Sequence, residues 1–366
     1  MIKIRSPGRI CLFGEHQDYL GFPVISLAIS KYIFLEARKI TKPFFSIHFP
    51  DTGIEMEIKL NNKELSYDST RDYIKSGYNF YIRKGIKFSN GYEIKITGDI
   101  PLNAGVASSS ALVIAWLYFL SIISDQKTDP HKLAIQGYKV EVEEFNEGGG
   151  MMDHFSSVFG KLIYLRSQFP EPFLNFYDLS LEGFILGNSM EKKSTVEDLK
   201  AVKKLSLNSF EILKELMPSF NMFGTTLQET LPFLESMDEK NKKKVIGNLN
   251  NRDITIKAKL LLDEYYKSKE NHTKNQKNRF YTQLGSLLSS HHQNLRDNIG
   301  VSTDKIDEMV NECIKNGALG SKINGSGFGG TMFALAPEKE QTIVNILESM
   351  GYESSILKAS EGVERY

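Results

Sequence analysis

The sequence is poor in cysteine, in net charge and in long apolar runs. It has 366 residues but only 2 cysteines, too few for the disulfide scaffold of a small secreted domain. Acidic and basic residues number 45 each, so overall charge favours neither a nucleic acid nor a membrane as partner. The longest apolar run, 111–120, is too short to cross a bilayer, and the first five residues lack a signal-peptide core. We therefore expect a cytoplasmic enzyme.

Apolar periodicity indicates a mixed fold. Strands are expected at 2–13, 32–40, 44–49, 54–60, 92–100, 161–165, 174–177, 184–188, 331–335 and 355–358. Helices are expected at 72–84, 107–123, 130–145, 151–159, 195–216, 222–235, 239–248, 251–267, 275–295, 306–316 and 338–350. The strands up to 184–188 belong to the first half, and a strand–helix–strand unit follows the helical region of the second. This order predicts an α+β fold with domains at 1–187 and 188–366.

Small residues between positions 101 and 112 run directly into an apolar helix. Small side chains let a ligand approach the backbone, and a helix N-terminus favours an anion such as phosphate. Ser108, Ser109 and Ser110 add hydroxyls that can reach phosphate oxygens or a magnesium ion. Taken alone, the stretch fits a serine-capped core helix equally well.

A polar turn follows the first strand and presents Glu15, His16 and Asp18 close together. Carboxylates accept hydrogen bonds from sugar hydroxyls and an imidazole can donate or accept, so the cluster fits a sugar. Two acids and one histidine do not match a closed zinc site. Arg9 lies inside the apolar strand, where an unpaired charge would be costly, so an ordinary surface turn is the weaker interpretation.

Two further glycine-rich segments stand out. Three glycines at 148–150 precede Asp153 at the start of a helix, where the residue is either a general base or, from local sequence alone, more typically a cap. Residues 320–330 satisfy the dinucleotide pattern G-x-G-x-x-G. That pattern should open a helix, and the apolar residues that follow it read as a strand, so a dinucleotide site is excluded.

Together these segments resemble, in order and spacing, the three motifs of the GHMP kinases, and the resemblance covers nearly the whole chain. Residues 7–19 (PGRICLFGEHQDY), 150–155 (GMMDHF), 290–297 (SHHQNLRD) and 301–303 (VST) are most similar to the galactokinase branch. The resemblance implies an N-terminal domain like domain 2 of ribosomal protein S5 and a ferredoxin-like C-terminal domain. It further implies a kinase that phosphorylates the C1 hydroxyl of a monosaccharide, with galactose as the first expectation.

Residue roles follow from the same resemblance. Asp153 would be the base or orienting carboxylate, and Arg9 would stabilise developing charge. The sugar would bind to Glu15, His16 and Asp18, helped by the backbone of Gly149 and Gly150. ATP phosphates would lie at Gly105, Ala107, Ser108, Ser109 and Ser110. Ser109 and Glu141 would hold Mg²⁺.

Some positions depart from the galactokinase pattern. Gln17 stands where threonine is usual, Gly149 where many have cysteine, and Ala107 replaces the first serine of the loop. Residues 20–25 (LGFPVI) are more similar to the mevalonate kinases. Another sugar (galacturonate, arabinose or N-acetylgalactosamine), mevalonate, and a sugar- and ATP-binding sensor without turnover therefore remain open. Known galactokinases suggest a monomer or weak homodimer, with no nucleic-acid or membrane partner.

Overall fold

A large, mostly antiparallel sheet carries the first half of the chain in the computed structural model, which describes residues 1–126, 129–167, 171–191, 195–268 and 272–366. Its order is β12-β1-β2-β5-β3-β4, with β6 attached to β2 and β7 to β6. The strands are β1 (Ile2–Phe13), β2 (Pro23–Ile40), β3 (Phe44–Phe49), β4 (Ile54–Lys59), β5 (Gly91–Gly98), β6 (Leu162–Arg166), β7 (Phe173–Tyr177) and β12 (Glu364–Arg365). The late strand β12 returns from the second half to pair with β1.

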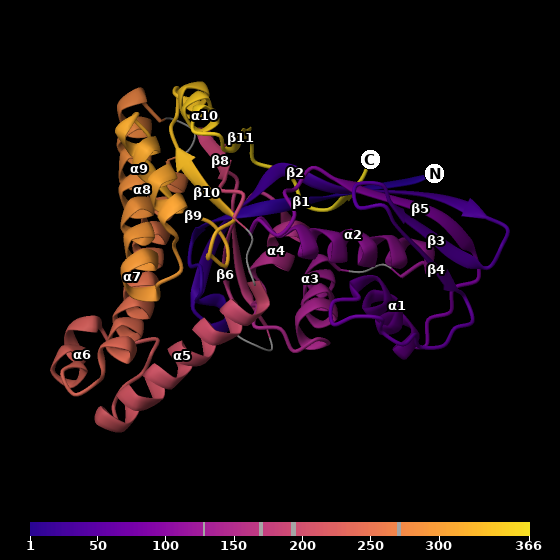
Figure 1. Cartoon of the computed structure of the whole chain (residues 1–366), viewed down its shortest axis with the longest axis horizontal. Coiled ribbons are helices and arrows are strands. Elements are labelled where there is room, and N and C mark those ends of the chain that lie inside the picture. Colours follow the sequence, from indigo (N-terminus) through magenta and orange to yellow (C-terminus); the bar gives the residue numbers. More distant parts are fainter. Residues whose placement is uncertain (127–128, 168–170, 192–194, 269–271) are drawn as a thin grey trace.

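Four helices gather on one side of this sheet (Figure 1). They are α1 (Tyr73–Arg83), α2 (Ser108–Ile123), α3 (Pro130–Tyr138) and α4 (Met152–Phe159). Helix α2 is apolar on nearly all faces because it lies in the core between the sheet and the other helices. Trp116 is fully buried there, and its indole N–H donates to the carbonyl of Ile74 at 2.9 Å.

A smaller sheet forms the second unit. Its order is β11-β8-β10-β9 with every pairing antiparallel, from β8 (Phe184–Asn188), β9 (Gly320–Ile323), β10 (Thr331–Leu335) and β11 (Glu353–Leu357). Counted along the chain this is 4-1-3-2, the ferredoxin-like order, which confirms the expected fold class. The helices of this half are α5 (Thr195–Leu216), α6 (Leu227–Leu234), α7 (Glu239–Lys267), α8 (Lys274–Asn294), α9 (Asp304–Lys315) and α10 (Glu340–Ser349).

Several expected elements differ in the structure. The strand expected at 184–188 forms as β8, but placing it with the first half was wrong, because it pairs with β10 and β11. The domain division at 187/188 stays a proposal, although all of β8 (Phe184–Asn188) pairs with strands of the second unit. Strand β2 begins at Pro23 rather than at residue 32, because its first part pairs with β6. Strand β9 begins inside the glycine-rich segment and was not expected.

Two helices also differ from expectation. The pieces expected at 239–248 and 251–267 are one helix, α7. Asparagine normally favours helix ends, but the amide of Asn248 bonds back into the helix and donates to the carbonyl of Lys244 at 2.8 Å. The helix expected at 130–145 continues beyond α3 as a π-helix, η2 (Lys139–Glu143). No helix in the described part of the chain is long and apolar enough to span a membrane.

Candidate active site

Every site residue expected from the sequence lines one cleft in the structure. The residues come from β1, the turn after it, the loop before α2, the first turn of α2, η2, the glycine stretch before α4 and the start of α4. Several of these segments are far apart in sequence. They are Arg9, Glu15, His16, Asp18, Gly105, Ala107, Ser108, Ser109, Ser110, Glu141, Gly149, Gly150 and Asp153. Gly325 and Ser326 of the late glycine-rich loop complete the wall.

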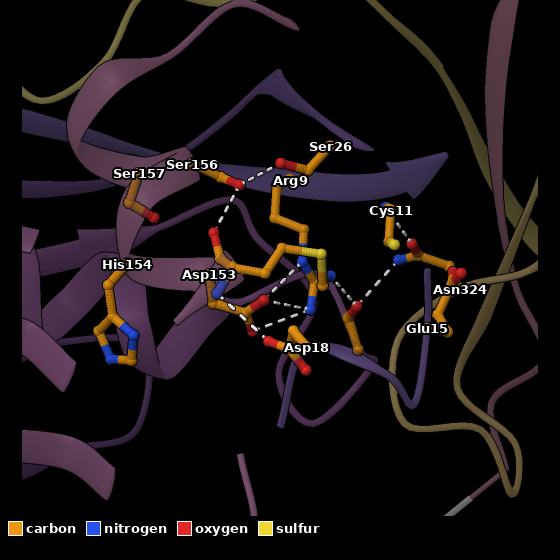
Figure 2. A network of polar contacts seen from close by, with 12 residues as sticks. Arg9, Cys11, Glu15, Asp18, Ser26, Asp153, His154, Ser156, Ser157 and Asn324 are labelled. Carbon is orange, nitrogen blue, oxygen red and sulfur yellow. Dashed lines mark hydrogen bonds and ion pairs between the residues drawn. The ribbon is translucent and has the colours of Figure 1, made fainter. Parts of the chain in front are cut away.

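Arg9 and Asp153 both line this cleft and point toward one another (Figure 2). Nε of Arg9 donates to Oδ1 of Asp153 and one terminal nitrogen donates to Oδ2, both at 2.8 Å. The other terminal nitrogen donates to the carbonyl of Gly105 at 2.5 Å. Burial alone would lower the pKa of Arg9, but the Asp153 carboxylate outweighs it and the pKa is raised. The positive charge of Arg9, which would be costly inside an apolar strand if unpaired, is therefore compensated by Asp153.

Asp153 does not cap helix α4. The N-cap position is Met151, and Asp153 lies inside the first turn, with its side chain 28% exposed and directed toward Arg9. The cap interpretation, which local sequence favoured, is wrong. The helix instead fixes the direction of a partly exposed carboxylate, as a base or orienting group requires.

Asp18 lies beside the glycine stretch that precedes α4. Its Oδ1 accepts from the backbone N–H of Tyr19 at 2.9 Å, and its Oδ2 accepts from that of Met152 at 3.3 Å. A Cβ at Gly150 would lie 2.1 Å from Oδ2, so only glycine permits this approach. Burial, and then the neighbouring Asp153 charge, raises the pKa of Asp18 to about 6.

The small-residue loop before α2 has a strained backbone. Gly105 and Ala107 both adopt positive φ, 84° and 64°, and Ala107 is the N-cap of α2 without a side-chain cap bond. The interpretation of this stretch as a serine-capped core helix is therefore wrong about the cap, because the serines are the first residues of α2 itself. All three serines line the cleft, and the first turn of a helix carries N–H groups without intrahelical partners, so this wall suits an anion.

Glu141 faces the serines from the π-helix η2. Its Oε2 bonds to Nε2 of His154 at 2.8 Å, and both side chains are buried. Burial alone would raise the pKa of Glu141, but hydrogen bonds from His154, Ser109 and Ser110 outweigh it and hold the pKa below its usual value. A carboxylate and a hydroxyl are the hard oxygen donors that Mg²⁺ prefers, so the donor set fits that ion.

The late glycine-rich loop, residues 324–330, joins the second unit to the first. Asn324 accepts from the backbone N–H of Cys11 at 2.9 Å and donates to the carbonyl of Gly105 at 2.8 Å. A Cβ at Gly325 would lie 2.5 Å from that same carbonyl. The backbone of His16 has a positive φ of 61°, and Nε2 of its ring bonds to the carbonyl of Ser326 at 2.9 Å. The loop therefore packs against both the small-residue loop and the turn after β1, and holds them in place.

Sequence reasoning missed the residues that hold the turn after β1 from behind. Asn251 of α7 donates to the carbonyl of Glu15 at 3.3 Å. Gln17, one of the departures from the galactokinase pattern, turns away from the cleft, and its amide donates to Thr255 of α7 at 3.1 Å. Polar residues on a helix usually face solvent, so nothing in the local pattern marked these contacts.

Arg71 was also missed. It lines the cleft and donates to both carboxylate oxygens of Glu147 at 3.0 and 3.1 Å, while the hydroxyl of Tyr73 donates to Glu147 at 2.7 Å. Burial alone would lower the pKa of Arg71, but the bonded Glu147 keeps it raised. No glycine or apolar pattern surrounds this arginine in the sequence, so only the fold identifies it.

A second, mainly apolar pocket adjoins the cleft. The two share Arg71, Asn103, Ser108 and Ser109. The apolar side chains of this pocket come from β2, β3, β4, β5, α1, α2 and the loops beside them: Ile33, Phe49, Ile54, Met56, Ile74, Ile96, Ile100, Leu102 and Leu112. An apolar space that opens beside a helix N-terminus suits a flat base attached to a phosphate chain.

Comparison with known families gives three matches along the chain. The galactokinase galactose-binding signature matches residues 2–39, the GHMP kinase N-terminal domain matches residues 72–161, and the GHMP kinase C-terminal domain matches residues 274–353. A galactokinase of Pyrococcus furiosus is 30% identical over 353 residues, covering 93% of this chain and 91% of the relative. A mevalonate kinase of the same organism is 26% identical over 371 residues, covering 98% and 96%.

Solved structures share the fold. The galactokinase of Lactococcus lactis, crystallised with galactose, superimposes with a TM-score of 0.83 at 21% identity and covers 100% of this chain and 95% of its own. The mevalonate kinase of Methanococcus jannaschii superimposes with a TM-score of 0.70 at 18% identity, covering 98% of each chain. At this sequence identity the likeness shows a shared fold, and the substrate has to be inferred from the residues of the site.

Proposed function

Because the chain belongs to the GHMP kinase family of phosphotransferases, we propose that it transfers the γ-phosphate of ATP to the C1 hydroxyl of a monosaccharide, and that the sugar is galactose. The observation that carries the proposal is the Arg9–Asp153 pair, which lies where the turn after β1 meets the small-residue loop before α2. We also place this activity in the cytoplasm.

Phosphoryl transfer depends mainly on positioning and on neutralising charge. In this proposal Asp153 accepts or orients the proton of the attacking hydroxyl. Arg9, held on both sides by Asp153 and Gly105, stabilises the charge that develops between the sugar oxygen and the phosphate. Asp18, with the backbone at Gly149 and Gly150, fixes the sugar so that its hydroxyl faces Asp153.

The nucleotide would occupy the other side of the cleft. Phosphates would lie at Ser108, Ser109 and Ser110 on the N-terminus of α2, and the base would enter the apolar pocket that shares Ser108 and Ser109 with the cleft. Ser109 and Glu141 would hold Mg²⁺, which when bound neutralises phosphate charge.

Mevalonate is the second candidate, since mevalonate kinases are similarly close relatives. Charge argues against it. Mevalonate carries a carboxylate, whereas the sugar side of the cleft presents Asp18 and Glu15, and the two arginines of the cleft are already paired with Asp153 and Glu147. A neutral polyol matches these acceptors better than an anion does. The galactose-binding signature over residues 2–39 supports the same choice.

The test is ADP release with Mg-ATP across galactose, galactosamine, N-acetylgalactosamine, galacturonate, arabinose, fucose, glucose and mevalonate. We expect turnover on galactose that Asp153→Asn abolishes. Turnover on mevalonate alone would favour the second candidate. Calorimetric binding of ATP and a sugar without turnover would indicate a sensor, and no binding of ATP would refute the proposal.

A further inference from the structure

A buried charge pair behind the turn after β1 joins the two units of the protein. Lys322 of β9 is fully buried, and its ammonium donates to the carboxylate of Glu15, to the carbonyl of Cys11 at 3.0 Å and to that of Ile323 at 2.7 Å. Each ammonium proton therefore has an acceptor. Burying a lysine is costly without such partners, so three matched acceptors mark a specific arrangement.

The carboxylate of Glu15 is held at only one of its two oxygens. Oε1 pairs with Lys322, while Oε2 accepts no hydrogen bond from any residue that the structure describes, although the side chain is 1% exposed. Glu15 also lines the cleft, whereas Lys322 does not. A buried carboxylate oxygen with free lone pairs needs a donor, and the cleft is the side from which a ligand can supply one.

His291 of α8 lies on the protein side of the same oxygen. Its Nδ1 is 3.7 Å from Oε2, too far for a direct hydrogen bond, and its ring stacks on Phe13. Burial, and then the Lys322 charge, lowers the pKa of His291 well below its usual value, so the ring is neutral. The imidazole packs beside Oε2 without neutralising it.

We propose that Lys322 and His291 position Glu15 so that Oε2 accepts a hydrogen bond from one substrate hydroxyl, which makes Lys322 a specificity-determining residue supplied by the second unit. This inference rests on the proposed sugar kinase function. Lys322 acts through Glu15. It also fixes the carbonyl of Cys11, two residues beyond Arg9 on β1, so one contact sets both the sugar acceptor and the strand of the catalytic arginine.

The consequence is discrimination for a single hydroxyl. A site built to bond a hydroxyl rejects the analogue that lacks it, because the buried acceptor is left unpaired. If Lys322 is removed, Glu15 loses its anchor and can turn to other partners. The substrate should then bind less well, and a substrate analogue that lacks this hydroxyl should show almost the same kcat/KM as the substrate itself.

The experiment compares galactose with its 2-, 3-, 4- and 6-deoxy analogues in the wild type, Lys322→Met and Lys322→Arg. Lys244→Met is the matched control, because Lys244 of α7 is also a buried lysine but donates to the carbonyl of Ile299, away from Glu15. For the wild type we expect kcat/KM to fall about 100-fold or more on one deoxy sugar.

For Lys322→Met we expect kcat/KM on galactose to fall about 10–100-fold, mainly through KM, with almost no further fall on that deoxy sugar. Lys322→Arg should retain most of the discrimination and Lys244→Met all of it. Equal losses on every sugar, with the discrimination intact, would overturn the inference, since a merely structural role predicts that pattern.

If Lys322→Met does not fold, Glu15→Gln/Lys322→Met removes both buried charges together and is compared with Glu15→Gln alone. Equal kcat/KM values for these two variants on every sugar support the inference, since Lys322 then acts through Glu15, and a further fall on every sugar in the double variant overturns it. If the wild type phosphorylates none of these sugars, the proposed function fails and the inference fails with it, a result distinct from retained discrimination in an active enzyme.

Discussion

Asp153→Asn is the sharpest test of the central pair, because it removes a charge with almost no change in volume. The asparagine keeps one acceptor oxygen for Arg9 and presents an NH₂ group to the other guanidinium nitrogen. One of the two 2.8 Å bonds is therefore lost and replaced by a donor facing a donor. Breaking a buried ion pair costs about 3–5 kcal/mol. Water reaches Asp153, whose side chain is 28% exposed, so we expect about 2–3 kcal/mol of lost stability.

The effect on catalysis should be larger than the effect on folding. A positioned base contributes about 10²–10⁴ in rate, and Arg9 also loses its alignment, so kcat should fall by about 10³-fold or more. Sugar affinity should change by less than about tenfold, because Asp18 and the glycine backbone remain in place. Coupled ADP release gives kcat, calorimetry gives the sugar Kd, and thermal unfolding gives the stability.

Asp263→Asn is the matched control. Asp263 is also 28% exposed, pairs with Lys259 at 2.5 Å and accepts from the hydroxyl of Tyr177 at 2.6 Å, and it does not line the cleft. We expect a similar loss of stability with kcat within about twofold of the wild type. A folded Asp153→Asn that keeps kcat within about tenfold would refute the role of Asp153.

Four further predictions concern the rest of the cleft. Gly150→Ala should raise the sugar KM by about tenfold or more while sparing ATP affinity, because its Cβ would meet Asp18 Oδ2 at 2.1 Å; an unchanged KM would contradict this contact. Sugar kcat/KM should fall about tenfold per pH unit below about 6, where Asp18 gains a proton, and Asp18→Asn should lack that limb. Folding raises this pKa from 3.8, so the unfolding free energy should drop by up to about 3 kcal/mol as the pH rises from 4 to 7. Denaturant unfolding at a series of pH values measures it, and an unfolding free energy that does not change with pH would contradict the prediction. Glu141→Gln should raise the magnesium concentration for half-maximal activity by about tenfold, and an unshifted titration would remove Glu141 from the ion site.

The sequence predicted that Arg9 needed a partner, since an arginine inside an apolar strand cannot stay unpaired. Physical reasoning did not identify that partner. Asp153 lies 144 positions away, and only the resemblance to a known family placed the two together. Short-range patterns report the neighbours within a turn or a strand, and a pair of this separation depends on the whole fold.

Other features left no local signal. Asn251 and Thr255 look like solvent-facing helix residues, yet they support the turn after β1 because α7 buries its polar face there. Strand β8 follows the first-half strands in the chain, but sheet membership is decided by long-range pairing that sequence order does not reveal. The π-helical turn that carries Glu141 has the same apolar spacing as an α-helix, so its position was expected and its geometry was not.

The pairing of β12 with β1 has a consequence for synthesis on the ribosome. The first unit contains its helices and most of its sheet once β7 has been made, yet one edge of that sheet stays open until residues 364–365 arrive. Residues Ala359 and Glu361 of the same segment also bridge to Ile29 and Gly160. At about 5–20 residues per second, the roughly 190 intervening residues impose a delay of about 10–40 s. During this interval the edge of β1 at Ile4 and Arg5 lacks its partner, and an unpaired edge strand can pair with another chain and aggregate.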